Sequence, residues 1–418
     1  MAAPAYSVLI TTPSYAPELT GVGRYTGELA VGLAVRGAAT EVVCPPPHYP
    51  GWYVRPPYSA SRYAAEWLDG VRVWRCPIFL RKKASGLVRL LTSLSFGLTA
   101  SPVLVWRILS QRPDVVLCVE PTLATAPTAL LAAWLVGART VLHVQDLEVD
   151  AALAVGHIRL PKPLLRLAFG VERLLMRRFD QIVTISTKMQ TAIERKGVPA
   201  ERLVLVRNWV DVERIRPLGT PNGYREELGL QDRFVCLYSG QIGRKQALHL
   251  VLDAAESLQD DARFAFVIAG DGPERESLQQ RYGALPNVRF LPLQPETRLP
   301  EFLNLADCHM LPQDAGMSEL VLPSKLGGML ASGKRILVTA DPDSELAEFL
   351  QASATIVAPG SPSAIVEGLL SLIQARDTTQ AARLALARTI SATDSLDRFA
   401  ALLGKLAGSG RRKLRRAA

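Results

Sequence analysis

The sequence predicts an α/β protein of two doubly wound domains, each a largely parallel β-sheet with helices on both faces. Three observations predict this fold class. The chain has 418 residues, which suits two domains of roughly 200 residues each. Apolar residues make up 48% of the chain, so each half can bury a core. Short apolar runs typical of buried strands alternate with amphipathic segments typical of helices, and the alternation forms two series.

The first series covers residues 1–207 and predicts the N-terminal domain. Its apolar runs are rich in valine, leucine and isoleucine and end at polar residues, as strands buried on both faces do. Helical periodicity lies between them, for example at Arg24–Arg36 and Leu164–Phe179. The expected strands are Ser7–Thr12, Thr40–Val43, Val71–Cys76, Val115–Val119, Thr140–Val144, Gln181–Ile185 and Leu203–Val206.

The alternation stops at residues 208–232, where two prolines, two glycines and an asparagine fall within a few positions, as in linkers. It resumes over 233–390, the predicted C-terminal domain. Residues 391–418 are expected to form a C-terminal helix and basic tail, which could pack back on the N-terminal domain. The strands expected in the second domain are Phe234–Ser239, Phe264–Ala269, Val288–Leu291, Cys308–Leu311, Ile336–Thr339 and Thr355–Ala358.

Charge and cysteine usage exclude several classes of protein. The formal charge is +9, but six of the positive side chains fall in the last fourteen residues, so the rest of the chain is only mildly basic. Basic residues interleaved with aromatics, as in nucleic-acid-binding faces, are missing, so we expect no nucleic-acid partner. The five cysteines form no C-x-x-C pair and the five histidines show no ligand spacing. We therefore expect buried thiols in a reduced cytosolic protein, and no metal site.

In each of the two predicted domains, a glycine-containing loop follows the first strand. Gly21 and Gly23 precede Arg24 and a helix, so main-chain N–H groups and the positive helix end could hold an anion there. A plain tight turn explains these glycines equally well. In the second domain Gly240 leads to the adjacent cations Arg244 and Lys245. Two permanent charges at the end of a strand could neutralise a diphosphate.

Two further loops lie at the ends of later strands. Gly270 and Gly272 stand between a strand and a helix, where a tight turn is again an alternative interpretation. Ser324 and Lys325 open the helix that ends near Gly333, and could hold phosphate or ribose. Because ligands of doubly wound domains bind outside the carboxyl ends of the strands, all four loops are candidate parts of one site.

Taken together, these loops resemble the GT-B glycosyltransferases of family 4, in particular bacterial exopolysaccharide and O-antigen transferases of the WcaI/WbuB type. The matching stretches span about residues 6 to 360, most of the chain, in the family's order. They are Tyr15-Ala-Pro-Glu-Leu-Thr-Gly-Val-Gly-Arg-Tyr-Thr-Gly-Glu, His143-Val-Gln-Asp-Leu-Glu-Val-Asp, Asn208-Trp-Val-Asp, Ser239-Gly-Gln-Ile-Gly-Arg-Lys-Gln, Gly270-Asp-Gly-Pro and Leu322-Pro-Ser-Lys-Leu-Gly-Gly-Met-Leu-Ala-Ser-Gly.

The resemblance implies two Rossmann-like domains facing across a cleft, with the nucleotide-sugar donor bound mainly by the second. It implies that Arg244 and Lys245 bind the diphosphate and that the loop of Gly21 and Gly23 closes over the donor. It also implies retention of the anomeric configuration without a cofactor or divalent metal. Fucose, N-acetylfucosamine and other deoxy sugars are all compatible, from a uridine or a guanosine donor.

One departure from the family concerns the ribose of the donor. Many family 4 members carry two glutamates eight positions apart, of which the second binds the ribose. Counting back from the Ala-x-Gly ending at Gly333, these positions are Leu320 and Gly328 here. Glu319, together with Ser324 and Lys325, could substitute for the missing pair.

Three carboxylates follow the expected strand that ends near Val144. Asp146, Glu148 and Asp150 could activate an acceptor hydroxyl, or stabilise positive charge that develops on the sugar. Capping of the next helix is the other interpretation. Asp146 matches the aspartate of the family's frequent His-Asp pair, with Gln145 in place of the histidine. We therefore take Asp146 as the candidate catalytic residue and assign Glu148 and Asp150 to the acceptor.

Basic residues at 81–83 precede an apolar helix that begins at Leu87, a pattern that suits an anionic lipid surface. The alternative is a helix buried on its own sheet. The family commonly uses polyprenyl-diphosphate-linked acceptors, so we expect a cytoplasmic protein that is peripheral on the inner face of the plasma membrane. A nucleotide-sugar epimerase on the same architecture, or a non-catalytic nucleotide-sugar-binding subunit, are the alternative functions.

Overall fold

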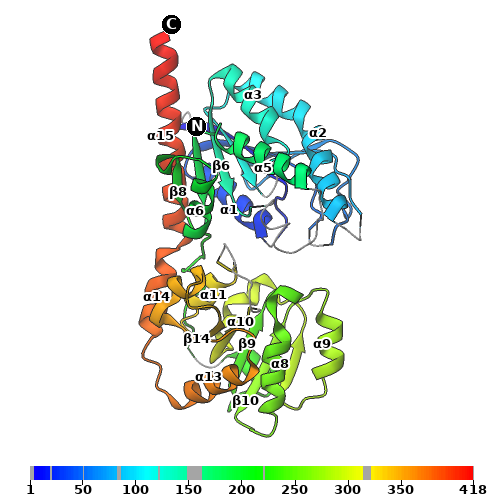
Figure 1. Ribbon diagram of the computed structural model, residues 1–418, viewed down its shortest axis with the longest axis vertical. Coiled ribbons are helices and arrows are strands. Elements are labelled where there is room, and N and C mark those ends of the chain that lie inside the picture. Colours follow the sequence, from blue (N-terminus) through cyan, green and yellow to red (C-terminus); the bar gives the residue numbers. More distant parts are fainter. Residues whose placement is uncertain are drawn as a thin grey trace. The chain divides into compact units, whose positions relative to one another are not determined.

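The computed structural model describes residues 4–18, 21–49, 51–81, 86–120, 123–147, 162–219, 222–313 and 322–417 (Figure 1). The chain divides into two compact units. The first consists of Met1–Arg207 with Leu396–Ala418, and the second of Asn208–Ser395. Each unit is a sheet of mainly parallel strands with helices against it, so the predicted fold class is confirmed.

The sheet of the first unit has the strand order β3-β4-β2-β1-β5-β6-β7-β8. Neighbouring strands are parallel, except for β3 and β4, which pair antiparallel at one edge. The central strands are almost completely buried, as parallel strands between two helical layers must be. The strands are β1 (Tyr6–Thr11), β2 (Ala38–Cys44), β3 (Ala64–Leu68), β4 (Val71–Arg75), β5 (Val115–Glu120), β6 (Arg139–Val144), β7 (Gln181–Thr184) and β8 (Leu203–Leu205).

The direction of each crossover assigns the helices of the first unit to the two faces of its sheet. The connection from β1 to β2 runs toward one edge, whereas those from β4 through β8 run toward the other. Because such crossovers are right-handed, α1 covers one face and the later helices cover the opposite face. These elements are α1 (Gly21–Val35), α2 (Gly86–Gln111), α3 (Ala126–Val136), α5 (Lys162–Met176), α6 (Thr187–Arg195) and the short η1 (Ala200–Arg202).

The final helix, α15 (Ala392–Ala417), packs beside α1 on the first unit. A Cβ atom on Gly32 of α1 would lie 2.9 Å from Leu396 Cδ1. Arg36 forms a 2.7 Å salt bridge with Asp397. Phe399 stacks edge-on against the His143 ring of β6 at 5.1 Å between centroids. The last helix thus supplies side chains to the core of the unit in which the chain begins.

The second unit has an all-parallel sheet in the order β11-β10-β9-β12-β13-β14. Its strands are β9 (Phe234–Ser239), β10 (Phe264–Ala269), β11 (Val288–Leu291), β12 (Cys308–Leu311), β13 (Arg335–Thr339) and β14 (Thr355–Val357). Its helices are α7 (Gly223–Leu228), α8 (Leu248–Ser257), α9 (Arg275–Tyr282), α10 (Leu299–Asn304), α11 (Leu326–Ala331), α12 (Glu345–Leu350), α13 (Pro362–Gln374) and α14 (Gln380–Thr389), with 3-10 turns η2 (Arg244–Gln246), η3 (Glu296–Arg298) and η4 (Gln351–Ser353).

The expected linker at 208–232 differs from the structure, which assigns its described residues to the second unit. Val210 forms a β-bridge with Ser391, and its N–H donates to the carbonyl of Ile390 at 3.0 Å. Asn222 caps α7, and Tyr224 of that helix stacks on Phe302 at 5.0 Å. The turn-forming residues therefore separate short packed segments, where the sequence had indicated an open connection.

All five cysteines are buried and free, as expected from the sequence. Burial raises the pKa of Cys44, Cys76, Cys118 and Cys308 to about 12. These thiols are therefore protonated core side chains at neutral pH.

Candidate active site

The predicted donor-binding glycines of the second unit lie where two strand-end loops meet. Gly240 follows β9 and Gly270 follows β10, and the Gly240 N–H donates to the carbonyl of Ala269 at 3.0 Å. A Cβ atom on Gly270 would lie 1.8 Å from the Gly240 carbonyl oxygen, and one on Gly272 would lie 2.2 Å from that of Ile242. Both glycines also have positive φ values, +140° and +156°. Close contact between the two backbones therefore requires glycine at both positions.

Lys325 reaches the same loop from the start of α11. Its Nζ lies 3.9 Å from the centroid of the Tyr238 ring, near the end of β9. A Cβ atom on Gly240 would lie 3.5 Å from that Nζ. The structure thus brings together two residues that are 85 positions apart and were predicted separately, Gly240 and Lys325. Ser324, in the turn before α11, is exposed to solvent.

Tyr238 is a component of this site that sequence reasoning missed. Its side chain is fully buried and lies beneath the Lys325 ammonium group, and its hydroxyl donates to the Gln241 carbonyl. Burial raises the pKa of this hydroxyl, so the ring remains neutral under the cation. Such a cation–π contact fixes the direction of a lysine without neutralising its charge. In the sequence, the position of Tyr238 near the end of a predicted strand is the feature that could have indicated its place in the site.

Arg244 and Lys245 form the 3-10 turn η2, directly before α8, and both are exposed. The backbone changes direction at Ala247, which is fully buried and has a left-handed φ of +43°. The two cations therefore remain in contact with solvent, close in sequence to the glycine loop of β9. Permanent charges at the carboxyl end of a parallel strand can attract and neutralise a diphosphate.

In the first unit, Gly21 and Gly23 form the first turn of α1, where the sequence had suggested a loop. Gly21 has a left-handed φ of +57° and open space around its missing side chain. A Cβ atom on Gly23 would lie 2.9 Å from the Glu18 carboxylate and from the Ser14 hydroxyl. Arg24 forms a 2.8 Å salt bridge with Glu28 within the helix.

Glu18 is a second component that the sequence did not reveal. Only 6% of this residue is exposed, and one carboxylate oxygen accepts hydrogen bonds from the His48 and Tyr49 N–H groups at 2.7 and 2.9 Å. Ser14 donates to the other oxygen. Burial raises the pKa of this carboxyl group, against the opposing effect of these donors. Glu18 thus joins the segment before α1 to the loop after β2.

Arg75 supports the same segment from β4. Its guanidinium is almost fully buried and donates to the Ala16 carbonyl at 2.6 Å and to Glu66 at 2.7 Å. It also lies over the Tyr15 ring, 5.7 Å from the centroid. The start of α1 is therefore positioned by two buried charged residues, Glu18 and Arg75.

Asp146 follows β6 and is exposed, whereas its neighbours Gln145 and Leu147 are buried. His143 points the other way, toward Phe399, and burial lowers the pKa of its imidazole to about 3. Because His143 is fully buried and its imidazole is a weak base, it is not available as a general base. Glu148 and Asp150 lie outside the described residues, as does Glu319.

The helix position that carries the second family glutamate is closely packed here. A Cβ atom on Gly328 would lie 3.0 Å from Leu303 Cδ1 and 3.8 Å from Ile215 Cδ1. The neighbouring residue Gly327 is also closely packed, because a Cβ atom on Gly327 would lie 2.9 Å from the Cβ of Val210. A larger residue at 328 would first meet apolar side chains of the core.

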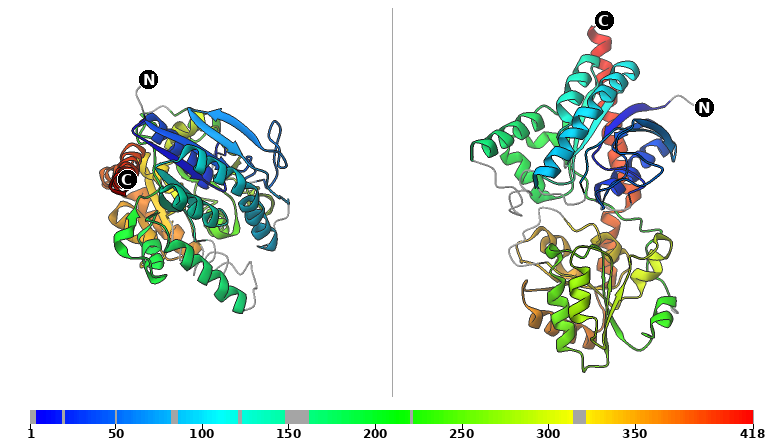
Figure 2. Two further views of the ribbon diagram at one scale, coloured as in Figure 1. Left: turned by 90° about the horizontal axis from the view of Figure 1, so that it is seen from above. Right: turned by 90° about the vertical axis from the view of Figure 1, so that its right-hand side faces the viewer.

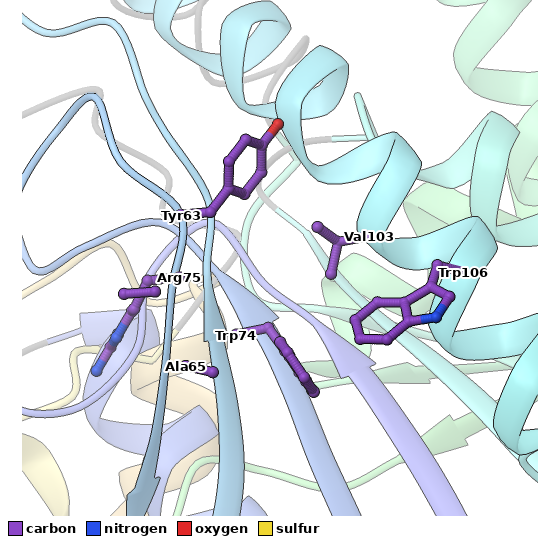
Figure 3. Close-up of a pocket in the computed structure, with 7 residues that line it drawn as sticks. Tyr63, Ala65, Trp74, Arg75, Val103 and Trp106 are labelled. Carbon is purple, nitrogen blue, oxygen red and sulfur yellow. The ribbon is translucent and has the colours of Figure 1, made fainter.

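Among the described residues, no three His, Cys, Asp or Glu side chains are grouped so that they could hold a metal ion. A cavity of about 300 Å³ lies at the β3 edge of the first unit, where Ala64 of β3 pairs with Arg75 at the end of β4 (Figure 3). Its walls are largely apolar and include Tyr63, Trp74, Val103 and Trp106. Arg75, the charged residue in this wall, is already paired with Glu66, so the cavity offers no group for glycosyl transfer.

Two α/β units with cationic and glycine-rich strand-end loops have the architecture of a GT-B glycosyltransferase, and comparisons with known proteins agree. Residues 20–209 match the family described as "Glycosyl transferase 4-like domain", and residues 223–385 match "Glycosyl transferases group 1". The chain is 38% identical over 403 residues to "Putative colanic acid biosynthesis glycosyl transferase WcaI" of Escherichia coli (strain K12), covering 94% of this chain and 98% of that relative. The chain therefore belongs to the GT-B glycosyltransferases of family 4.

Solved structures show the same fold at low sequence identity. A glycosyltransferase from Rickettsia africae superposes with a TM-score of 0.69 and 11% identity, covering 96% of this chain and 98% of that one. Anabaena HepE, solved in complex with UDP-glucose, superposes with a TM-score of 0.67 and 15% identity, covering 96% of this chain and all of that one.

Proposed function

We propose that the protein transfers a sugar, with retention of configuration, from a nucleoside-diphosphate donor to a lipid-linked saccharide during synthesis of a bacterial exopolysaccharide or O-antigen. A deoxy sugar such as fucose or N-acetylfucosamine fits this proposal, as does either a uridine or a guanosine donor. The name of the Escherichia coli relative supports the exopolysaccharide role, and the UDP-glucose complex of HepE supports a nucleotide-sugar donor.

The observation that carries the proposal is the cationic surface at the end of β9. Lys325 lies over Tyr238 beside Gly240, and the exposed Arg244 and Lys245 follow in the same loop. As the bond between sugar and diphosphate breaks, negative charge grows on the leaving diphosphate. Fixed cations next to that charge stabilise the transition state more than the ground state. They can therefore replace the divalent metal that other sugar transferases need.

We assign Asp146 to the reacting centre, as the carboxylate that orients or deprotonates the acceptor hydroxyl. Its exposure at the end of β6 supports this role, because Asp146 is accessible to an acceptor while its neighbours Gln145 and Leu147 are buried in the unit. Buried His143 cannot substitute for it. An Asp146→Asn enzyme that keeps near-normal turnover would show that the assignment is wrong.

A thermal-shift panel with UDP, GDP and their sugars tests the donor site directly. We expect one nucleotide series to raise the melting temperature of the wild-type protein, because a ligand that binds only the folded state stabilises it. Replacing both cations (Arg244→Gln with Lys245→Gln) should abolish this shift and lower transfer by about a hundredfold or more. Both side chains are exposed, so the melting temperature without ligand should be unchanged.

Arg281→Gln is the matched control, because this exposed arginine lies at the far end of α9, away from the strand-end loops. It should keep both the ligand-induced shift and the transfer activity. A double variant that still transfers sugar at the wild-type rate would overturn the assignment of the diphosphate site.

A further inference from the structure

His48 lies in the loop after β2, at the edge of the first unit's sheet where Asp146 also lies. Strands β2, β1, β5 and β6 are parallel neighbours, so their carboxyl ends share one edge. His48 follows β2, and Asp146 follows β6. Ligands of doubly wound domains bind outside this edge. The function proposed above gives His48 no role, so its surroundings indicate what it can do.

The imidazole ring of His48 is held in one tautomer. Its Nδ1 lies 3.0 Å from the carbonyl oxygen of Pro46. Because a carbonyl oxygen can only accept a hydrogen bond, Nδ1 must carry a proton and donate it. In the neutral ring the lone pair is therefore on Nε2, which makes Nε2 a hydrogen-bond acceptor.

Nε2 is the atom of His48 that a ligand can reach. The His48 side chain is only 8% exposed, yet Nε2 has no hydrogen-bond partner among the described residues and still reaches the surface. In His143 and His309, by contrast, Nε2 lies 3.0 Å from a polar side chain of the same unit. A firmly held acceptor that faces outward at a strand-end loop is suited to bind a donor group of a ligand.

Glu18 holds the His48 loop from the segment before α1. Its Oε1 accepts hydrogen bonds from the N–H groups of His48 and Tyr49, and it lies 3.6 Å from His48 Nδ1. Figure 2 shows this part of the first unit in blue, where the segment before α1 and the loop after β2 lie side by side. The buried Glu18 side chain thus fixes both the backbone of His48 and the direction of its ring.

Trp52 also supports the ring, and its backbone is strained. Its φ is +55°, in the left-handed region that a bulky residue rarely adopts. Its ring lies edge-on to that of His48 at 6.1 Å between centroids, and the Arg89 guanidinium lies 5.5 Å from the Trp52 ring centroid. Strain of this kind persists only where the surroundings enforce it, and it gathers at ligand-binding sites.

We propose that His48 is a substrate-binding residue, whose Nε2 accepts a hydrogen bond from a hydroxyl group of the acceptor saccharide. The inference rests on the proposed function, since the ligand it names is the acceptor of that reaction. Sugar hydroxyls are hydrogen-bond donors, and a site built to bind one of them discriminates against an analogue that lacks it. His48 therefore sets the affinity for the acceptor and its selection, and Asp146 keeps its role at the reacting centre.

Isothermal titration calorimetry of the full-length protein with short-chain acceptor analogues tests the proposal. The probes are citronellyl diphosphates that carry glucose, galactose or N-acetylglucosamine, and citronellyl diphosphate without a sugar. We expect the wild type to bind at least one sugar-bearing probe more tightly than the sugar-free probe. His48→Asn should weaken binding of that probe by about tenfold and leave binding of the sugar-free probe unchanged.

His48→Gln separates contact with the ligand from a structural role. The amide of asparagine can take the place of Nδ1 and keep the hydrogen bond to Pro46, whereas the longer glutamine can place its amide oxygen where Nε2 lies. If Nε2 contacts the sugar, the glutamine variant should bind within about threefold of the wild type, well above the asparagine variant. A histidine with only a structural role would give the reverse order.

Tyr53→Phe is the matched control, because it removes a polar group from the same loop, where the Tyr53 hydroxyl accepts a hydrogen bond from Arg55 at 2.9 Å. It should bind every probe as the wild type does. Melting temperatures show that each variant is folded. The UDP and GDP thermal shifts should be the same in all of them, since Arg244, Lys245 and Lys325 belong to the second unit.

These shifts also distinguish the two proposals. A wild type that responds to no nucleotide would contradict the proposed function, whereas a normal response with a failed calorimetric test would contradict the role of His48 alone. Three calorimetric results would overturn that role. The wild type could bind no sugar-bearing probe more tightly than the sugar-free one, or His48→Asn could keep the wild-type affinity. Equal losses on probes with and without sugar would instead place His48 at the diphosphate.

Discussion

At the scale of single residues, Gly270 and Gly272 illustrate how a binding motif can have a structural cause of its own. The sequence assigned both to the donor, and that assignment stays a prediction. In the structure their missing side chains let the β10 loop contact the backbone of the β9 loop. The two glycines therefore act on the cationic site indirectly as well, by holding Gly240 and Ile242 in place.

We predict that Gly270→Ala will lower the free energy of unfolding by about 3 kcal/mol, from backbone strain and overlap with the Gly240 carbonyl. Gly229→Ala is the control for the overlap, because Gly229 also has a positive φ, +65° against +140° at Gly270, but has nothing within 4 Å of its missing Cβ. Gly229→Ala should lower the free energy of unfolding by only about 1 kcal/mol. Urea unfolding of the two variants measures the difference, and equal losses would contradict the account of the loop contact.

Residue-level chemistry also explains which site features the sequence could reveal. Arg244, Lys245 and Asp146 are recognisable because their charges follow apolar strands and remain exposed. Glu18 and Arg75 were missed because their importance comes from burial and from partners distant in sequence, such as the His48 N–H and the Ala16 carbonyl. Nothing in a local pattern distinguishes such residues from surface charges.

At the scale of elements, strand β6 and helix α15 depend on each other through His143 and Phe399. Gln145 presents an amide N–H 3.0 Å from His143 Nε2, so this nitrogen accepts a hydrogen bond and the imidazole is neutral. Protonation would remove the acceptor and place a charge in an apolar core. The contact between the two elements is therefore sensitive to acid.

We predict that the first unit loses stability as the pH falls from about 6.5 toward 3. The folded-state pKa of His143, about 3, lies below its ordinary value of 6.5, so the unfolded chain binds the extra proton first. This one group should destabilise the unit by about 1.4 kcal/mol per pH unit in that window. Denaturant midpoints near pH 7 and pH 5 measure it.

His143→Gln should flatten this pH dependence in the first unit. His309 of β12 is also fully buried with a pKa lowered to about 3, so the second unit should keep its own acid sensitivity in the same variant. Identical pH slopes for wild type and variant would contradict the prediction.

The burial of each strand explains whether it could be predicted from the sequence. Each expected strand is present with its ends within two residues, because strands buried on both faces must be continuously apolar. Strand β3 was missed because it lies at the edge and pairs antiparallel with β4 alone. All five of its residues, Ala64–Leu68, are exposed or half-buried, so its sequence carries neither an apolar run nor a clear alternation.

At the scale of the whole molecule, the fold class and the order of the elements could be predicted, but the extent of the second unit could not. The repeated alternation of strands and helices is a property of the entire chain and remains visible without any partner. The assignment of 208–232 to the second unit depends on contacts such as that of Tyr224 with Phe302, which proximity in sequence does not indicate.

We predict that sugar transfer continues unchanged in excess EDTA and is not stimulated by Mg²⁺ or Mn²⁺. The reason is that Arg244, Lys245 and Lys325 carry charges that do not depend on a bound ion. Initial rates with and without chelator measure this, once a donor has been identified. Loss of activity in EDTA with recovery on adding Mn²⁺ would show that the cations do not suffice.

The return of α15 to the first unit has a consequence for biosynthesis. Phe399 and Leu403 are buried parts of that unit, yet they are synthesised after the whole of the second unit. The second unit is complete at Ser395 and can close its core while the chain is still being made. The half of the protein that is translated first is therefore the half that finishes folding last, and a stop codon directly after Ser395 would damage the beginning of the chain more than its middle.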